Sequence, residues 1–240
     1  MKRSAILSKI AKLVELYESG EIPRPEVHEV YPDLDKSSRD NYLYFTLTVP
    51  LNYQRSSPAM WQSALATFND PETNYLFYPE KVVEAEYVQF QNDLAKHKLS
   101  LQINNHSKIW WGISQTLFNE YESDPRKLLA SGGHAVKQIK DKLISEKKSF
   151  PYLNGPKMSN YWLFILSEFT DVELSGKEDI SIIPDTHVIK ASAVLGVIDS
   201  ADPMEIERAW KELLSGSDFI PMQIHPVLWH WSRNGFKPVV

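Results

Sequence analysis

Residues 149–169, SFPYLNGPKMSNYWLFILSEF, and residues 182–197, IIPDTHVIKASAVLGV, decide the fold. The first stretch is a turn rich in proline and glycine followed by an apolar run, whose period predicts a helix that starts near Lys157. In the second stretch Asp185 follows a proline and precedes an apolar-periodic run that ends at Gly196, which is typical of a helix with a carboxylate N-cap. Two consecutive helices are therefore expected to begin at an amine and at an acid.

The rest of the chain predicts a mainly α fold. Asp124-Pro125 and Asp202-Pro203 each place a capping side chain before a proline at the first helical position. Residues 59–68 and 106–121 carry apolar residues at helical spacing. Residues 42–54, rich in aromatic and β-branched side chains, fit either a buried helix or an extended segment. Alternating strand patterns bounded by turn residues are scarce.

The sequence predicts one domain over residues 1–240, in which an N-terminal helix and linker over 1–40 precede two helical lobes. Lys and Glu side chains interrupt the apolar residues of 1–23, so this stretch predicts an amphipathic helix rather than a signal peptide. The lobes are expected to meet near 150–160 around an active-site cleft. No stretch approaches the roughly 18 apolar residues that span a bilayer, so we expect no membrane partner. Separately, we expect a monomer as the default and a cytoplasmic, nucleoid-associated location.

Composition excludes several kinds of site. The chain has no cysteine, which excludes disulfides, thiolate zinc sites and cysteine-ligated iron–sulfur clusters. His187, His225 and His230 lack the spacing of metal ligands, so we expect no metal and no cofactor. The net charge of −5 argues against nucleic-acid binding through bulk positive potential. Such binding needs a local surface, and the lysine-rich segment 134–148 is either that surface or only the solvated face of a helix.

An amine and an acid at two helix beginnings suit the cleavage of a base–sugar bond. A turn that leads into a helix leaves backbone N–H groups unpaired, and these bind phosphate well. Positive charge and aromatic neighbours near Lys157 favour a nucleophilic amine. The carboxylate of Asp185 could stabilise the positive charge that develops on the sugar when the base departs.

These residues resemble the helix-hairpin-helix family of DNA glycosylases, whose pattern is a hairpin, then Lys-Thr-Ala-Asn with an apolar run, then Val-Asp-Thr-His-Val. The matching stretches are GPKMSNYWL, 155–163, and IPDTHVIKAS, 183–192. The matching residues are Lys157, Ser159, Asn160, Leu163, Asp185, Thr186, His187 and Val188. A third stretch, LNYQRSSPAMWQSA at 51–64, resembles the family's Ser-Gln-Gln-Thr segment and the tryptophan-bearing helix after it.

The resemblance implies a base-excision repair enzyme that binds duplex DNA and has both glycosylase and AP lyase activity. It implies that Lys157 attacks C1′ of the damaged nucleotide and forms a Schiff base, which permits strand cleavage, while Asp185 assists. The chain looks most like the archaeal GO glycosylases, which remove 8-oxoguanine, an oxidised purine. By that likeness the extruded base would be held by Gln54, Trp229 and His225. The DNA itself would be contacted by Asn154, Gly155, Ser159 and His187.

The chain departs from the family pattern at the hairpin and at His225, and it leaves a second alignment register open. The usual Leu-Pro-Gly-Val-Gly hairpin is here Pro-Tyr-Leu-Asn-Gly over 151–155, which retains one glycine. A rival register aligns Leu153 and Gly155 with the first Leu and Gly of the hairpin and puts Ser159 where the lysine belongs. His225 stands where the archaeal enzymes carry an acid. The alternative functions are a non-catalytic nucleic-acid-binding module of the same fold and a glycosylase that acts on modified nucleosides.

Overall fold

The computed structural model describes residues 3–23, 30–53 and 55–240. These residues form twelve α-helices and three 3-10 helices, and they contain no strand beyond one isolated β-bridge between Ala135 and Ser175. The predicted mainly α fold is confirmed. None of the helices in the described ranges combines the length and the apolar character that crossing a membrane requires.

The chain divides into two compact units. The terminal unit comprises Met1–Glu26 and Gly176–Val240, and the central unit comprises Val27–Ser175. The two ends of the sequence therefore fold together, while the middle of the chain forms a core of its own. Lys157 belongs to the central unit and Asp185 to the terminal unit.

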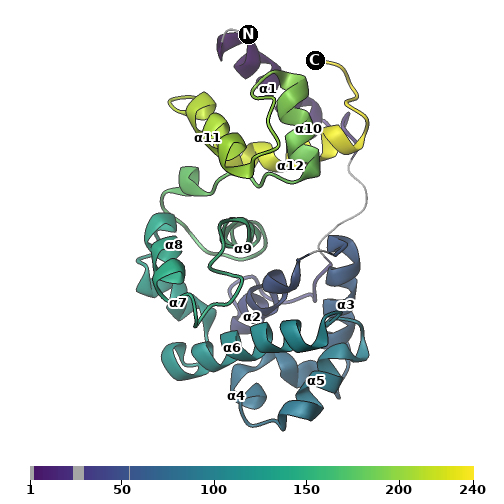
Figure 1. Cartoon of the computed structure of the whole chain (residues 1–240), viewed down its shortest axis with the longest axis vertical. Coiled ribbons are helices and arrows are strands. Elements are labelled where there is room, and N and C mark those ends of the chain that lie inside the picture. The colour runs from purple at the N-terminus through teal and green to yellow at the C-terminus, as the bar shows by residue number, and fades with distance from the viewer. Residues whose placement is uncertain (1–2, 24–29, 54) are drawn as a thin grey trace. The chain divides into compact units, whose positions relative to one another are not determined.

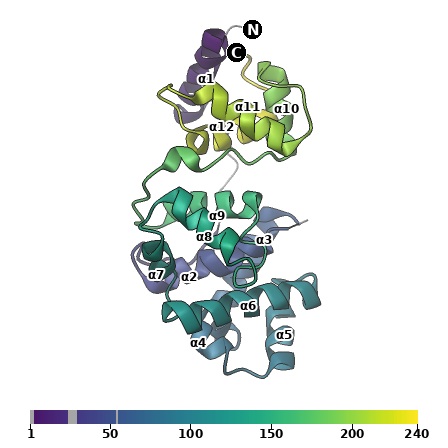
Figure 2. The ribbon, with the colours of Figure 1, turned by 60° about the vertical axis from the view of Figure 1, so that its left-hand side comes forward.

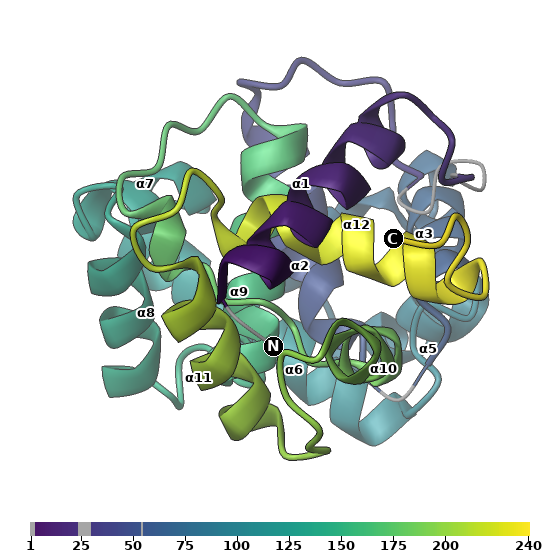
Figure 3. The same ribbon diagram turned by 90° about the horizontal axis from the view of Figure 1, so that it is seen from above.

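In the terminal unit three α-helices pack around a fourth, α12 (Figure 3). Its elements are α1 (Arg3–Glu18), η3 (Lys177–Asp179), α10 (Thr186–Leu195), α11 (Pro203–Leu214) and α12 (Pro221–Arg233). Helices α1, α10 and α11 all contact α12. Leu13 of α1, Trp210 of α11 and Leu228 of α12 are fully buried in the shared core. The N-terminal amphipathic helix that the sequence predicted thus buries its apolar stripe against helices from the other end of the chain.

The central unit is built around α2 (Figure 1). Its elements are α2 (Arg39–Thr48), η1 (Val49–Leu51), α3 (Ser57–Asn69), η2 (Asn74–Phe77), α4 (Pro79–Val82), α5 (Tyr87–Lys96), α6 (Ile103–Tyr121), α7 (Pro125–Ser131), α8 (Val136–Ser145) and α9 (Pro156–Phe169). Every residue from Asn41 to Thr48 is buried. A helix covered on all sides has no polar stripe, which is why its sequence fitted a helix and an extended segment equally well.

Aromatic rings fill the space around α2. The ring of Tyr44 stacks on Phe77 with centroids 5.4 Å apart and lies 5.9 Å from the ring of Trp61. Trp162 of α9 donates its indole N–H to the hydroxyl of Thr46 at 3.1 Å. Such pairs add specific geometry to apolar burial. The Trp162–Thr46 hydrogen bond fixes α9, the helix that carries Lys157, against α2 at the centre of the unit.

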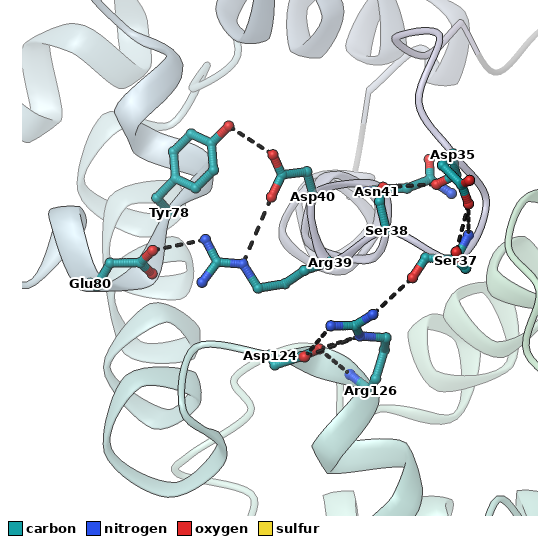
Figure 4. A network of polar contacts seen from close by, with 10 residues as sticks. All are labelled: Asp35, Ser37, Ser38, Arg39, Asp40, Asn41, Tyr78, Glu80, Asp124 and Arg126. Atoms are coloured by element: carbon teal, nitrogen blue, oxygen red, sulfur yellow. Dashed lines mark hydrogen bonds and ion pairs between the residues drawn. The ribbon is translucent and has the colours of Figure 1, made fainter.

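Three aspartate caps confirm the helix beginnings that the sequence predicted. Asp124, Asp185 and Asp202 accept backbone N–H groups at the starts of α7, α10 and α11. Asp124 is also part of a polar network in the central unit (Figure 4). It binds Arg126 through both carboxylate oxygens, and Arg126 donates to the carbonyl of Ser37 at 2.8 Å. The network thereby connects the start of α7 with the turn that precedes α2.

The cap and the ion pair of Asp124 should together stabilise the central unit. We expect Asp124→Ala to lower the free energy of unfolding by about 2 kcal/mol, because the cap and the charged hydrogen bonds are lost together. Glu86→Ala, which removes an exposed cap that accepts only the Gln89 N–H, should cost about 0.5 kcal/mol. Urea denaturation of both variants measures the difference, and equal losses would show that the Arg126 pair adds nothing.

Candidate functional site

Lys157 lies at the second position of α9, and its side chain is exposed. The N-cap residue, Gly155, has no side chain to cap the helix. The backbone N–H groups of Lys157 and Met158 have no hydrogen-bond partner among the described residues. The aromatic shielding that we expected for the amine is absent, because the side chain points into solvent. What the structure does provide is an amine beside unpaired N–H donors, an arrangement that favours an anion.

The polar residues after Lys157 shape the first turn of α9. Ser159 Oγ and Asn160 Nδ2 both donate to the carbonyl of Pro156, at 3.2 and 2.8 Å. Asn160 Oδ1 accepts a hydrogen bond from Lys140 of α8 at 3.0 Å. Both side chains are buried. Ser159, for which the resemblance implied a DNA contact, therefore holds the turn together from inside the unit.

Helices α8 and α9 lie side by side (Figure 2) and are joined by a turn. One residue of this turn has a left-handed backbone, and that residue is a tyrosine. Tyr152 has φ +65°, whereas Gly155 has φ −76°, which any residue can adopt. A left-handed conformation costs a bulky residue roughly 1–2 kcal/mol. Asn105 donates to Tyr152 Oη at 3.0 Å and so helps to hold the ring. Sequence reasoning did not single out Tyr152, because it compared this hairpin with the family pattern by its glycines.

Neighbouring contacts hold the remainder of the turn. Asn154 donates its side-chain amide to the carbonyl of Lys147 at 3.0 Å and its N–H to Phe150. A Cβ added to Gly155 would lie 3.4 Å from the carbonyl oxygen of Tyr152, at the limit of ordinary van der Waals contact, so neither the space nor the backbone conformation requires glycine there. The two predicted DNA contacts in this turn, Asn154 and Gly155, are both half-buried.

Asp185 caps α10 with one oxygen and leaves the other available. Its Oδ1 accepts the N–H groups of His187 and Val188, both at 2.9 Å. Within the described part of the chain Oδ2 has no hydrogen-bond partner. The side chain is half-buried. The N-cap geometry fixes the orientation of the carboxylate, so that its second oxygen can face a cationic ligand.

An aromatic and cationic group lies next to Asp185 in the terminal unit. His187 Nδ1 lies 3.2 Å from Ser232 Oγ, and the His187 ring meets the edge of Trp229 at 5.1 Å between centroids. The guanidinium of Arg233 lies over the Trp229 ring, 5.0 Å from its centroid. A planar ligand that stacks on this face of Trp229 must therefore displace Arg233.

His225 and Trp231 are two further residues of α12 whose surroundings the structure shows. His225 Nδ1 accepts the N–H of Ile183 at 3.4 Å, two residues before Asp185. Trp231 is buried in the core and donates to the carbonyl of Pro238. Trp231 therefore belongs to the core of the terminal unit, whereas Trp229 is half-buried. The α10–α12 contact thus brings together four predicted residues, namely Asp185, His187, His225 and Trp229.

Gln54 lies outside the described residues. Its neighbour Arg55 donates to the carbonyls of Leu99 and Lys98 at 2.6 and 3.1 Å. In the lysine-rich segment 134–148, two of the lysines have internal partners. Lys140 binds Asn160, and Lys142 pairs with Glu146 at 2.9 Å.

His106, at the start of α6, is a buried histidine that sequence reasoning did not single out. Its Nδ1 accepts the N–H of Leu101 at 3.2 Å, while Nε2 is buried without a hydrogen-bond partner. Burial lowers the pKa of His106, because it disfavours the charged ring, and the charge of Arg55 lowers it further. The ring is therefore neutral in the folded protein near neutral pH, and the proton on Nε2 follows from the accepting role of Nδ1.

Comparison with models of known protein families gives no match, and comparison with curated proteins gives none either. The two motifs and their local geometry therefore carry the functional argument. Among the residues that the structure describes, no group of three or more His, Asp or Glu side chains is placed to hold a metal ion.

The cap of α10 predicts different outcomes for two substitutions of Asp185. Asp185→Asn should leave stability nearly unchanged, because asparagine caps helices as well as aspartate. Asp185→Ala should lower the free energy of unfolding by about 1 kcal/mol. Circular dichroism during urea denaturation measures both values. If Asn and Ala were equally destabilising, the negative charge rather than the cap would hold the helix start.

The neutral state of His106 predicts a pH-dependent stability. Because its folded pKa lies below its unfolded value of about 6.5, its stabilising contribution is present above that pH and is lost as the pH falls. We expect the unfolding free energy to decrease between about pH 7.5 and pH 5.5. His106→Asn keeps an acceptor near Nδ1 and removes the titrating ring, so its decrease should be smaller. Parallel slopes for the two proteins would contradict the assignment.

Proposed function

We propose that this chain is a DNA glycosylase with AP lyase activity, in which Lys157 and Asp185 act on the same nucleotide, and that its two helical units form a helix-hairpin-helix glycosylase fold. The observation that carries the proposal is the state of the two motif residues. Lys157 is an exposed amine beside unpaired N–H groups, and Asp185 has a carboxylate oriented by its cap with one oxygen available.

The burial of Ser159 supports the register in which Lys157 is the nucleophile. The rival register puts Ser159 at that position, yet its side chain is buried and donates to the Pro156 carbonyl. A nucleophile has to reach C1′ of a bound nucleotide, which an exposed side chain at a helix start can do. Lys157 meets this requirement, and Ser159 does not.

The proposed reaction uses each group for one task. The amine of Lys157 attacks C1′, so that an N–C bond forms while the glycosidic bond breaks, and the departing base takes up a proton from the attacking nitrogen. Asp185 stabilises the cationic sugar in the transition state. Loss of the ring C–O bond then gives a Schiff base, from which the strand is cleaved by elimination. The unpaired N–H groups of α9 suit a backbone phosphate near the target nucleotide.

The proposed substrate is an oxidised purine such as 8-oxoguanine in duplex DNA, on the strength of the sequence resemblance. Base extrusion costs a few kcal/mol and is easiest for damaged or mispaired bases. Trp229 is half-buried, with Arg233 over its ring and His187 next to it, so a planar base would stack on this ring by displacing Arg233. Gln54 and His225 remain the other candidates for contacts with the base.

Borohydride trapping tests the proposal directly. With an 8-oxoguanine duplex and reductant, the protein should form a covalent DNA adduct that Lys157→Gln abolishes, because reduction fixes the Schiff base. Lys36→Gln, which changes an exposed lysine of the central unit far from α9 in the sequence, is the matched control and should trap normally. Asp185→Asn should slow trapping by about 10²-fold, the lower range for loss of a charge-stabilising group. If none of a panel of damaged bases gave an adduct, the proposal of lyase activity would be wrong.

A non-catalytic nucleic-acid-binding module is the second candidate. The net charge of −5 and the tyrosine at the left-handed position of the turn favour it, because glycine lets backbone approach phosphate closely. Salt-dependent binding to DNA without base release or adduct would identify this function.

A further inference from the structure

Three loops of the central unit meet, and one of them is the turn that precedes Lys157. With the first residues of the helices that follow two of them, they comprise residues 52–53 and 55–57, 97–105 and 147–155, and we call the surface that they form the Tyr53–Tyr152 surface. Arg55 connects the first loop to the second through the carbonyls of Lys98 and Leu99. Asn105 connects the second to the third by donating to Tyr152 Oη.

The charge of this surface is opposite to that of the whole chain. The three loops contain four cationic side chains and neither aspartate nor glutamate, in a protein with a net charge of −5. The cations are Arg55, Lys98, Lys147 and Lys148. The three lysines are exposed. This segregation supplies the local positive surface that an acidic protein needs in order to hold an anionic polymer.

The same surface exposes aromatic and apolar side chains. The Tyr53 side chain is 38% exposed, and its ring meets that of Tyr152 edge to face with centroids 5.3 Å apart. Leu101 and Ile103 of the second loop are 58% and 41% exposed. Tyr152 is held in a conformation that is costly for a bulky residue. Strained residues persist where their surroundings fix them, and they cluster at functional sites.

We propose that the Tyr53–Tyr152 surface binds a nucleic-acid strand with unpaired bases, whose phosphates lie against the lysines and whose bases stack on the two tyrosines. Cations beside exposed aromatic rings are the combination that single strands require, because the charges follow the backbone while every base offers a π face. An acidic peptide would match the cations and leave the rings unused. The proposal needs neither Lys157 nor Asp185, so it holds for an enzyme and for a binding module.

Fluorescence anisotropy with the full chain tests the aromatic part. The probes are a labelled oligothymidylate of about 12 nucleotides, within the usual site size, and a blunt duplex of the same length. We expect tighter binding to the single strand and about a tenfold loss for Tyr53→Ala, since stacking on one base contributes on this scale. Tyr31→Ala is the matched control, because Tyr31 is 39% exposed and lies outside the three loops; it should bind as the unmodified protein does.

Salt dependence tests the cationic part. Lys98→Gln and Lys147→Gln should each weaken binding and each reduce the slope of log K against log salt by about one, while Lys81→Gln should change neither. Tyr152→Phe keeps the ring and loses only the Asn105 hydrogen bond, so a folded Tyr152→Phe protein should bind nearly normally.

Two results would overturn the proposal. One is preferred binding to the duplex with no effect of Tyr53→Ala. The other is competition by poly-glutamate as effective as that by unlabelled oligothymidylate. Borohydride trapping reports on the glycosylase proposal and oligothymidylate anisotropy reports on this one, so the failure of one proposal and the failure of the other would be separate observations.

Discussion

The constraint on which the candidate site depends is that a helix begins with N–H groups that its own carbonyls cannot satisfy. Helices α9 and α10 meet this constraint in opposite ways. Asp185 satisfies two N–H groups of α10 with a single carboxylate oxygen. At α9 the cap residue is Gly155, which offers no side chain, and Pro156 has no N–H to satisfy. One helix start thus carries an oriented negative charge, and the other remains open to an anion next to the amine of Lys157.

Asp185 and Lys157 differ in what fixes them within their own units. Asp185 is positioned by backbone hydrogen bonds, and the α10–α12 contact adds His187 and Trp229 beside it. Lys157 is positioned only through α9, which the Trp162–Thr46 hydrogen bond and the buried Asn160 hold in the central unit. An exposed, long side chain on a fixed helix start can adjust to a ligand, whereas a capping carboxylate cannot. This division suits a mobile nucleophile and a fixed charge.

Features that depend on nearby residues could be predicted from the sequence, whereas features that depend on contacts between distant segments could not. The sequence indicated the starts of α7, α10 and α11, because an aspartate cap acts on N–H groups two or three residues away. It could not decide the state of residues 42–54, because burial of α2 on all sides depends on α3, α7 and α9 packing around it. Nor could it show that Lys157 is exposed and Ser159 buried, since neighbouring residues of one helix turn differ only in which face the rest of the unit covers.

The turn before α9 shows why a motif reading can miss a structural equivalent. Glycines in a hairpin motif often mark positions with a left-handed backbone. Tyr152 adopts this conformation, at φ +65°, although it has a bulky side chain. The cost of about 1–2 kcal/mol has to be offset by contacts of the ring, and the structure provides two, with Asn105 and with Tyr53. Glycine would adopt the same backbone without that cost, but it would remove the ring from a surface where the chain has also gathered lysines and excluded acids. The tyrosine is therefore better explained by what its side chain contacts than by the turn itself.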